Sequence, residues 1–333
     1  MPLNHKHLIS TKDLQREEVD AILAESKKME RVLDRGGSQL LRGKILGSLF
    51  YEESTRTRMS SEAAMLRLGG SVISAVGFQF SSLYKGESIE DSIKVISGKV
   101  DLICMRHPEE GSAMRAIKTS RVPFVNCGDG PGEHPTQALL DLYTIQKECG
   151  RLRDLTISLV GDLKYGRTVH SLAFLLGLYG NKLKFVAPEQ LAMPGNIKDE
   201  LLEKGVEFEE STSLDDALDA DIGYMTRVQK ARFAGKMRLY KKLRHVFQVN
   251  EEKLRGKDIK IMHPLPRDVE IDTDVDELEN AIYFEESDNG DPVRMAIFAM
   301  LLGKSGDTTN QPRRGRAPMG PLCTKRPGSH KAA

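Results

Sequence analysis

The sequence predicts an α/β protein with two doubly wound parallel-sheet domains and a ligand site between them. Short apolar runs alternate with segments of helical periodicity, and this alternation restarts near residue 155. The chain has 333 residues, which is enough for two domains of about 150 residues each. Strands that alternate with helices form parallel sheets covered on both faces. The expected units are residues 1–150, residues 151–290, a C-terminal helix over 291–303 that returns to the first unit, and a disordered tail over 304–333.

The first unit begins with an expected helix over 13–34, where apolar residues recur at helical spacing among charges. Residues 79–88 are polar and are expected to form a loop. A helix follows Pro135 and is closed by Gly150, which suits the left-handed end of a helix. The other expected elements are strands over 45–50, 71–76, 101–105 and 122–125, and helices over 59–68 and 89–96.

The second unit repeats the alternation from residue 155 onward. Its basic segment 230–244 has few periodic apolar residues, and we expect a mobile surface segment there. The other expected elements are strands over 155–160, 183–186, 206–208, 222–225, 259–262 and 281–284, and helices over 167–180, 195–204, 214–219 and 292–302.

Composition excludes several classes of function. The formal net charge of +1 gives no global field toward nucleic acid or membrane, so an anion site must be local. No apolar run approaches the ~20 residues of a membrane span, and residues 1–13 lack the apolar core of a signal peptide. The four cysteines show no ligand spacing, which indicates reduced thiols, no metal site and a cytoplasmic protein. Cys104 and Cys127 are expected to be buried strand residues.

The stretch Ser54-Thr55-Arg56-Thr57-Arg58 lies where a predicted strand gives way to a helix. A helix N-terminus favours an anion, and arginine and hydroxyl side chains add donors for phosphate oxygens. Taken alone, these residues fit a capped helix with solvated arginines equally well. However, each polar cluster of the chain follows a predicted strand, and ligands of doubly wound sheets bind at the carboxyl ends of strands. The pattern as a whole therefore favours a binding site.

The ordered set of these clusters resembles the transcarbamoylases, and within them the branch that carbamoylates aspartate. The resemblance covers the chain to about residue 303. It rests on the motifs STRTR at 54–58, KGE at 85–87, MRHP at 105–108, GEHPTQ at 132–137, GDLKYGRTVHSL at 161–172, TRVQK at 226–230 and HPLPR at 263–267, with Asn289, Gly290 and Arg294.

The resemblance implies attack of the aspartate amine on the carbonyl carbon of carbamoyl phosphate, in de novo pyrimidine biosynthesis. It implies a catalytic set of Arg56, Thr57, Lys85, Arg106 and His134. Carbamoyl phosphate would contact Ser54, Thr55, Arg56, Thr57, Ser81, Lys85, Arg106, His134, Gln137 and the Leu265 carbonyl. Aspartate would contact Lys85, Arg167, Thr168, Arg227, Gln229 and the Pro266 carbonyl. Taken alone, His134 fits a helix cap better than a catalytic group, and each arginine fits a surface ion pair.

The resemblance also implies a homotrimer in which Ser81 and Lys85 reach the site of a neighbouring chain. No cofactor, metal, nucleic acid or membrane partner is expected. Two alternatives stay open: an ornithine carbamoyltransferase and a catalytically silent scaffold. Pro264 stands where the ornithine branch carries cysteine, and the paired arginines suit a dicarboxylate. Regulatory chains and multienzyme partners are not decided by the sequence.

Overall fold

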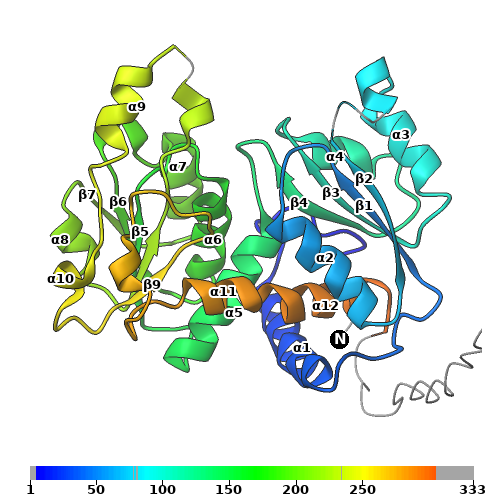
Figure 1. The fold of residues 1–333 in the computed structure, drawn as a ribbon, viewed down its shortest axis with the longest axis horizontal. Helices are drawn as coiled ribbons and strands as arrows, with labels where there is room; N and C mark the ends of the chain where they lie inside the picture. The colour runs from blue at the N-terminus through cyan, green and yellow to red at the C-terminus, as the bar shows by residue number, and fades with distance from the viewer. Residues whose placement is uncertain (1–4, 78, 80–81, 234, 305–333) are drawn as a thin grey trace, which may run out of the picture.

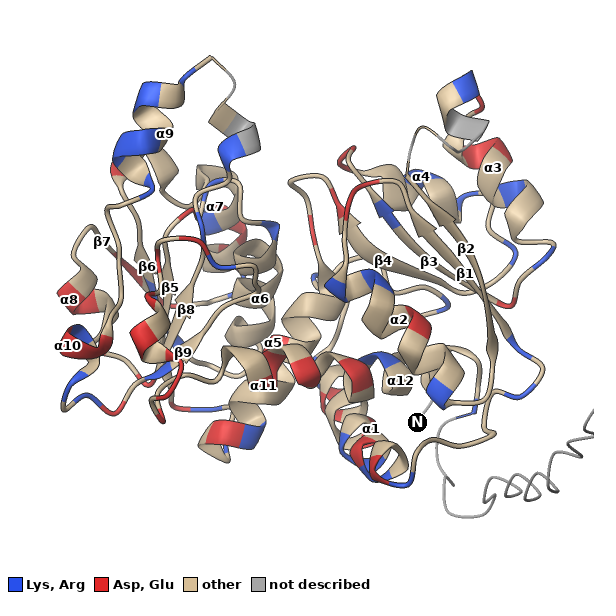
Figure 2. Ribbon diagram, viewed as in Figure 1, with Lys and Arg blue, Asp and Glu red and all other residues tan. Residues whose placement is uncertain are grey.

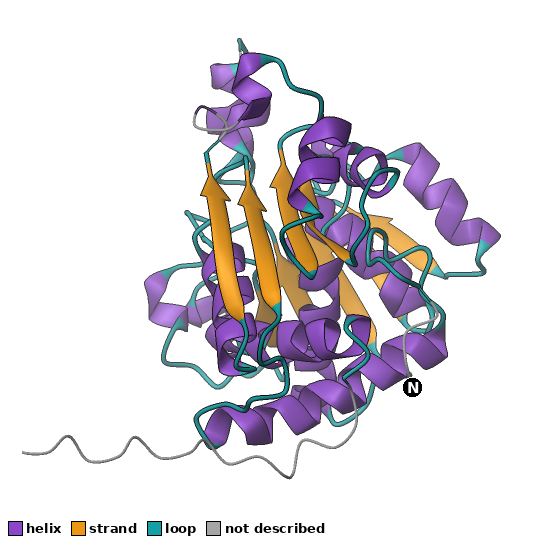
Figure 3. Cartoon of the chain, turned by 90° about the vertical axis from the view of Figure 1, so that its right-hand side faces the viewer, coloured by secondary structure: helices purple, strands orange, loops and turns teal. Residues whose placement is uncertain are grey.

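Two parallel β-sheets, each flanked by helices, form the protein (Figure 1). The structure is a computed structural model, and it describes residues 5–77, 79, 82–233 and 235–304. The strand order is β2-β1-β3-β4 in the first sheet and β7-β6-β5-β8-β9 in the second. All named strand pairs are parallel, and the arrows of the nearer sheet point the same way in Figure 3. The predicted fold class is confirmed.

The strands are β1 (Ile45–Phe50), β2 (Ser71–Val76), β3 (Leu102–His107), β4 (Phe124–Asp129), β5 (Thr156–Val160), β6 (Lys182–Val186), β7 (Phe208–Ser211), β8 (Ile222–Met225) and β9 (Lys260–Met262). The α-helices are α1 (Arg16–Asp34), α2 (Arg56–Arg67), α3 (Ile89–Ile96), α4 (Ser112–Ile117), α5 (Pro135–Cys149), α6 (Arg167–Gly177), α7 (Gly195–Glu203), α8 (Leu214–Ala217), α9 (Met237–Leu243), α10 (Glu251–Leu254), α11 (Tyr283–Asp288) and α12 (Gly290–Leu301).

The C-terminal helix α12 packs against α1, α2 and α5, beside the first sheet. Its side chains from Val293 to Met300 are buried, and all of them except Arg294 are apolar. Helices α5 and α6 pack against each other where the two sheets meet. Each sheet therefore has its own helices, and α5, α6, α11 and α12 lie close to the junction. No helix in the described ranges is long and apolar enough to span a bilayer.

The strand predicted over 281–284 is wrong. Only Ala281 pairs with the sheet, through a single bridge to Ile261, and helix α11 begins at Tyr283. Tyr283 and Glu286 are both buried, and their spacing of three residues is that of one helix face. A short apolar run has no periodicity long enough to separate a strand from a helix, which explains the error.

The basic segment 230–244 contains more structure than the sequence predicts. It includes the 3-10 helix η4 (Lys230–Phe233) and α9, whose Lys and Arg side chains colour it blue in Figure 2. Phe233, Tyr240 and Leu243 are buried, because they lie on the side that packs on the domain. These few buried apolar residues are enough to hold the segment against the domain, and the expected surface segment is partly helical. Its mobility stays a prediction.

The structure also describes parts of the predicted loop, cysteine positions and tail. Within the polar loop 79–88, the structure has the 3-10 helix η2 (Ser82–Lys85). Helix α4 was not expected from the sequence. Cys104 and Cys127 are buried in β3 and β4, as predicted. The tail expected over 304–333 is described only at Lys304, and residues 305–333 lie outside the described ranges.

Candidate functional site

A cavity of about 1370 Å³ opens between the carboxyl ends of the two sheets. Its wall contains most of the residues that the sequence singled out, although they are spread over more than 200 positions of the chain. Those residues are Ser54, Thr55, Arg56, Thr57, Arg106, His134 and Gln137 from the first unit, and Arg167, Thr168, Arg227, Gln229, Leu265 and Pro266 from the second. The two sheets thus contribute opposite walls of one site.

The 54–57 stretch forms the N-terminal end of α2. Thr55 is the N-cap residue, yet its side chain makes no capping hydrogen bond in the described structure. The Thr55 hydroxyl therefore does not bond to the backbone of the helix, and Thr55 does not cap the first backbone N–H groups of α2. This observation favours the anion site over the capped-helix alternative. Arg58 differs from its neighbours, because its guanidinium faces Glu62 at 3.9 Å on the same helix.

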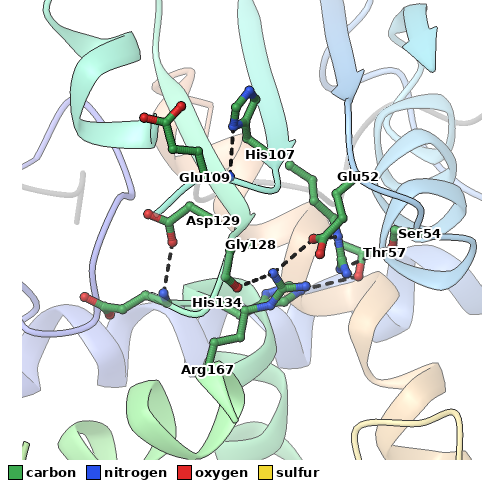
Figure 4. A network of polar contacts seen from close by, with 12 residues as sticks. Glu52, Ser54, Thr57, His107, Glu109, Gly128, Asp129, His134 and Arg167 are labelled. Atoms are coloured by element: carbon green, nitrogen blue, oxygen red, sulfur yellow. Dashed lines mark hydrogen bonds and ion pairs between the residues drawn. The ribbon is translucent and has the colours of Figure 1, made fainter. Parts of the chain in front are cut away.

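Glu52 joins two arginines at the centre of the cavity. Its Oε2 accepts from Arg106 Nε at 2.9 Å and from Arg167 Nη1 at 3.1 Å (Figure 4). Arg106 also donates to Ser54 Oγ at 3.4 Å, and Arg167 donates to the Gly130 carbonyl at 2.7 Å. Burial and the neighbouring Arg167 lower the pKa of Arg106 to about 10. Two guanidiniums held this close attract a further anion.

His134 is the N-cap residue of α5, and it is 3% exposed. Its Nδ1 lies 3.3 Å from the Gln137 backbone N–H, which donates to it, so the neutral ring carries its proton on Nε2. Its Nε2 lies 3.5 Å from Oγ1 of Thr57, which is in the first turn of α2. Burial, with Arg167, Arg106 and Arg294 nearby, holds the pKa of His134 well below its usual value. The residue is both a helix cap and a neutral hydrogen-bond donor into the cavity.

The second sheet supplies Arg167 at the start of α6 and Arg227 and Gln229 after β8. The Gln229 backbone N–H donates to Asp162 at 3.2 Å, and its side-chain amide donates to the Tyr165 carbonyl at 3.3 Å. Arg227 is exposed and lines the same cavity as Arg56, and burial together with the charge of Arg227 lowers the pKa of Arg56. Cations from both walls therefore face the same space.

Leu265 and Pro266 follow β9 in a turn with a left-handed backbone, where Leu265 has φ of 48°. The turn is anchored by His263, whose Nδ1 accepts from the Leu265 N–H at 2.7 Å and whose Nε2 contacts Glu270 at 2.8 Å. Such a conformation persists in a non-glycine residue only where its surroundings enforce it. Here it brings both residues to the cavity wall.

Sequence similarity assigns both halves of this site to known domains. Residues 6–147 match the domain described as "Aspartate/ornithine carbamoyltransferase, carbamoyl-P binding domain", and residues 153–301 match "Aspartate/ornithine carbamoyltransferase, Asp/Orn binding domain". The chain belongs to the aspartate/ornithine carbamoyltransferase family.

Relatives of this family resemble the chain over most of its length. The aspartate carbamoyltransferase catalytic subunit of Methanocaldococcus jannaschii is 51% identical over 300 residues, which are 89% of this chain and 98% of that one. Its crystal structure has a TM-score of 0.83 at 50% identity, over 90% of this chain and 98% of that one. Aspartate transcarbamoylase from Trypanosoma cruzi, in complex with carbamoyl phosphate and aspartate, has a TM-score of 0.83 at 37% identity, over 88% and 95% of the two chains.

The structure does not bring Lys85 or Ser81, which the family resemblance implies, into the described wall of this cavity, for two different reasons. Lys85 is exposed on η2 and is absent from the described residues of the cavity wall. Ser81 lies outside the described residues.

Sequence reasoning also missed several residues of the site. Glu52 lies two residues before the first residue of the STRTR motif, and an acidic residue so near the expected arginines was a usable signal. Ser60 and Asp291 contact each other and lie beside the buried Arg294, whose Nη1 donates to Ser60 at 2.9 Å. Nothing in the sequence pairs Ser60 with Asp291, because 231 positions separate them.

Proposed function

We propose that the chain transfers the carbamoyl group of carbamoyl phosphate to the amine of L-aspartate, giving N-carbamoyl-L-aspartate and phosphate in de novo pyrimidine biosynthesis. The observation that carries the proposal is that one cavity gathers a helix N-terminus, Arg106 and the neutral His134 from the first unit with Arg167 and Arg227 from the second. The phosphate wall suits a small dianion, and the two facing arginines suit a dicarboxylate. Family membership and the aspartate-named relatives support the same reaction.

The phosphate would bind at Ser54, Thr55, Arg56 and Thr57, where α2 presents backbone N–H groups and hydroxyls. Arg106 would bridge the phosphate and the carbonyl oxygen. Negative charge grows on that oxygen when the amine attacks, and Thr57, Arg106 and the Nε2–H of His134 would stabilise it there. A neutral imidazole donates without first losing a proton, which fits the lowered pKa of His134.

Gln137 and the Leu265 carbonyl would orient the carbamoyl NH2 group. Arg167, Thr168, Arg227 and Gln229 would hold the aspartate carboxylates, and the Pro266 carbonyl would accept a hydrogen bond from the attacking amine. The amine nitrogen forms a bond to the carbonyl carbon, and the bond from that carbon to the phosphate oxygen breaks. The leaving phosphate takes the proton of the amine, so the reaction requires no separate protein base.

We further propose a homotrimer in which Ser81 and Lys85 complete the site of a neighbouring chain. Lys85 is exposed and does not line the cavity of its own chain among the described residues. Large apolar side chains are also exposed on the edge strand β2, where Ile73 is 54% and Val76 46% exposed, and on α3, where Val95 is 58% exposed. An edge strand with exposed apolar side chains and unpaired backbone groups is open to a partner. The chain would act in the cytoplasm, with or without regulatory chains.

Mixing Lys85→Ala and His134→Ala chains tests the shared site. Each variant alone should be nearly inactive. A hybrid trimer regains some sites that have both residues, so activity should return after subunit exchange. No recovery after verified exchange would contradict sharing. Light scattering would separate a bare trimer from a monomer or a larger assembly.

A steady-state assay with carbamoyl phosphate tests the reaction itself. Carbamoylation of aspartate is the expected result. Carbamoylation of ornithine alone would move the chain to the sister activity, and Pro264 with the facing arginines argues against that. Failure with both amines would favour the silent scaffold.

A further inference from the structure

Two carboxyl groups lie buried against each other behind Gln137, at the junction of the two sheets. Asp141 on α5 is 0% exposed and Glu286 on α11 is 1% exposed. One oxygen of each lies close to the same nitrogen, Gln137 Nε2, which is 2.8 Å from Asp141 Oδ1 and 3.4 Å from Glu286 Oε1. The roles proposed above do not use either residue, and buried carboxyl groups without a direct cation partner are costly.

The hydrogen bonds around the pair show which oxygen holds a proton. Both Asp141 oxygens accept: Oδ1 from the Gln137 side-chain Nε2 at 2.8 Å, and Oδ2 from the Tyr224 hydroxyl at 2.8 Å. Glu286 Oε2 accepts from the His263 backbone N–H at 2.8 Å. Glu286 Oε1 lies 3.4 Å from Gln137 Nε2, the longest of these contacts. Oε1 is therefore the oxygen best placed to carry a proton and donate it to Asp141.

The groups facing the pair come from four elements. Tyr224 approaches from β8, His263 from the end of β9, Gln137 from α5, and the buried Arg294 from α12 acts on Asp141 through its charge. The His263 ring is itself turned toward Glu270. Arg294 is thus the one cation among these groups, and two buried carboxylates that approach the same amide nitrogen cannot both be ionised. Burial raises the pKa of Asp141 to about 7 and that of Glu286 well above its usual value, in agreement with an ionised Asp141 and a protonated Glu286.

We propose that Asp141 and Glu286 share one proton, and that this pair fixes the Gln137 side-chain amide with its oxygen toward the cavity. An ionised carboxylate only accepts, so the Gln137 nitrogen must be the atom that faces Asp141. The amide oxygen is then left on the side of the cavity wall, where it accepts an N–H of the substrate. This inference rests on the proposed function, in which that N–H belongs to the carbamoyl group.

The same pair also connects the two walls. Asp141 and Gln137 belong to α5 beside the first sheet, whereas Tyr224 and the His263 backbone belong to the second. Glu286 accepts from the backbone N–H of His263, which lies two residues before Leu265. The Leu265 carbonyl is proposed to orient the same NH2 group. Asp141 and Glu286 are positioning residues, since they act through Gln137 and the 263–266 turn.

The pH profile of Glu286→Gln tests the shared proton. In the wild type, loss of the proton at alkaline pH leaves two repelling charges, so kcat/KM for carbamoyl phosphate should fall. A glutamine keeps both contacts, because its nitrogen donates to Asp141 and its oxygen accepts from His263. Glu286→Gln should therefore retain activity at neutral pH and lose the alkaline fall, whereas Glu286→Ala loses activity at all pH values. Glu285→Gln removes an exposed charge from the same helix and should keep the wild-type profile.

A double-mutant cycle tests the effect on Gln137. Asp141→Ala should lower kcat/KM for carbamoyl phosphate by about tenfold, the value of roughly one hydrogen bond. In a Gln137→Ala background, it should have little further effect, because the amide that it orients is gone.

An infrared difference spectrum between wild type and Glu286→Gln gives a readout independent of activity: the wild type should carry the carbonyl stretch of a buried carboxylic acid. An alkaline fall unchanged in Glu286→Gln, additive effects in the cycle, or no acid band would each overturn the inference. A wild type inactive with aspartate at every pH, yet with the acid band present, would instead contradict the proposed function.

Discussion

The two walls of the cavity are built differently. On the wall of the first sheet, the site residues lie at the ends of regular elements: Thr57 in the first turn of α2, Arg106 in β3 and His134 at the N-cap of α5. Thr57 and His134 are buried and face each other. On the wall of the second sheet, Arg227 is exposed on the connection between β8 and η4, and Pro266 is exposed after β9.

This difference separates two tasks. Groups that stabilise developing charge must be held in place before the reaction, and the first wall provides such fixed donors. Groups that bind the second substrate need only meet it when it arrives, and exposed side chains on connections suffice for that. Changes in the first wall should therefore lower kcat, whereas changes in the second should raise KM for aspartate.

Arg106→Ala should have the largest effect. It removes a cation that lies 2.9 Å from Glu52 and 3.4 Å from Ser54, at the proposed junction of phosphate and carbonyl oxygen. We expect kcat/KM to fall by about 1000-fold, mostly through kcat. Steady-state kinetics with both substrates measures this. Arg115→Ala, which removes an exposed arginine paired with Glu90 on the same unit, should change little. Equal losses of kcat/KM in both variants would contradict the role of Arg106 in stabilising the developing charge.

Arg227→Ala should raise KM for aspartate by about 100-fold and leave the affinity for carbamoyl phosphate nearly unchanged. The reason is that Arg227 faces the cavity from the second wall and has no proposed contact with the reacting carbon. Titration calorimetry with carbamoyl phosphate and kinetics with aspartate separate the two affinities. Arg238→Ala, on the exposed side of α9, is the matched control. A weaker affinity for carbamoyl phosphate would show that the walls are not separate.

Phe233→Ala tests whether the 230–244 segment shapes the second wall. The ring packs at 6.4 Å from Tyr165 and 5.8 Å from Tyr240, measured between ring centroids. Without it, the connection that follows Arg227 and Gln229 should loosen, and KM for aspartate should rise by about tenfold with kcat unchanged. A selective loss of kcat would place the segment in the chemistry instead.

The smallest expected effect is on stability. The pKa of His134 lies well below 6.5 in the folded chain, so the unfolded chain takes up the proton first as the pH falls. The free energy of unfolding should therefore decrease as pH drops below 6.5, with a slope contribution of up to about 1.4 kcal/mol per pH unit. His134→Gln should reduce this slope in denaturant titrations, and the exposed His245→Gln should not. An unchanged slope in His134→Gln would mean that His134 is charged when folded.

Site residues that directly follow a strand were predicted more readily than those that folding brings together, for a physical reason. Ser54 to Thr57 are consecutive, and their strand-to-helix setting follows from local periodicity. Asp141 and Glu286 acquire their roles only when distant elements meet, so no local pattern marks them, whereas Glu52 had a local signal beside the expected arginines. The helix at 283 and the buried side of 230–244 were missed because a few apolar residues on a short segment fit several structures.

A crystal structure with N-(phosphonacetyl)-L-aspartate, which joins a phosphonate to an aspartate, would show directly which part of the cavity binds each substrate. We expect the phosphonate at Ser54 to Thr57 and Arg106, and the two carboxylates at Arg167 and Arg227 of the second unit. We also expect the ligand carbonyl to lie within hydrogen-bond distance of His134 Nε2. A phosphonate bound at Arg227, or carboxylates bound at the start of α2, would contradict the division of the cavity between the two substrates.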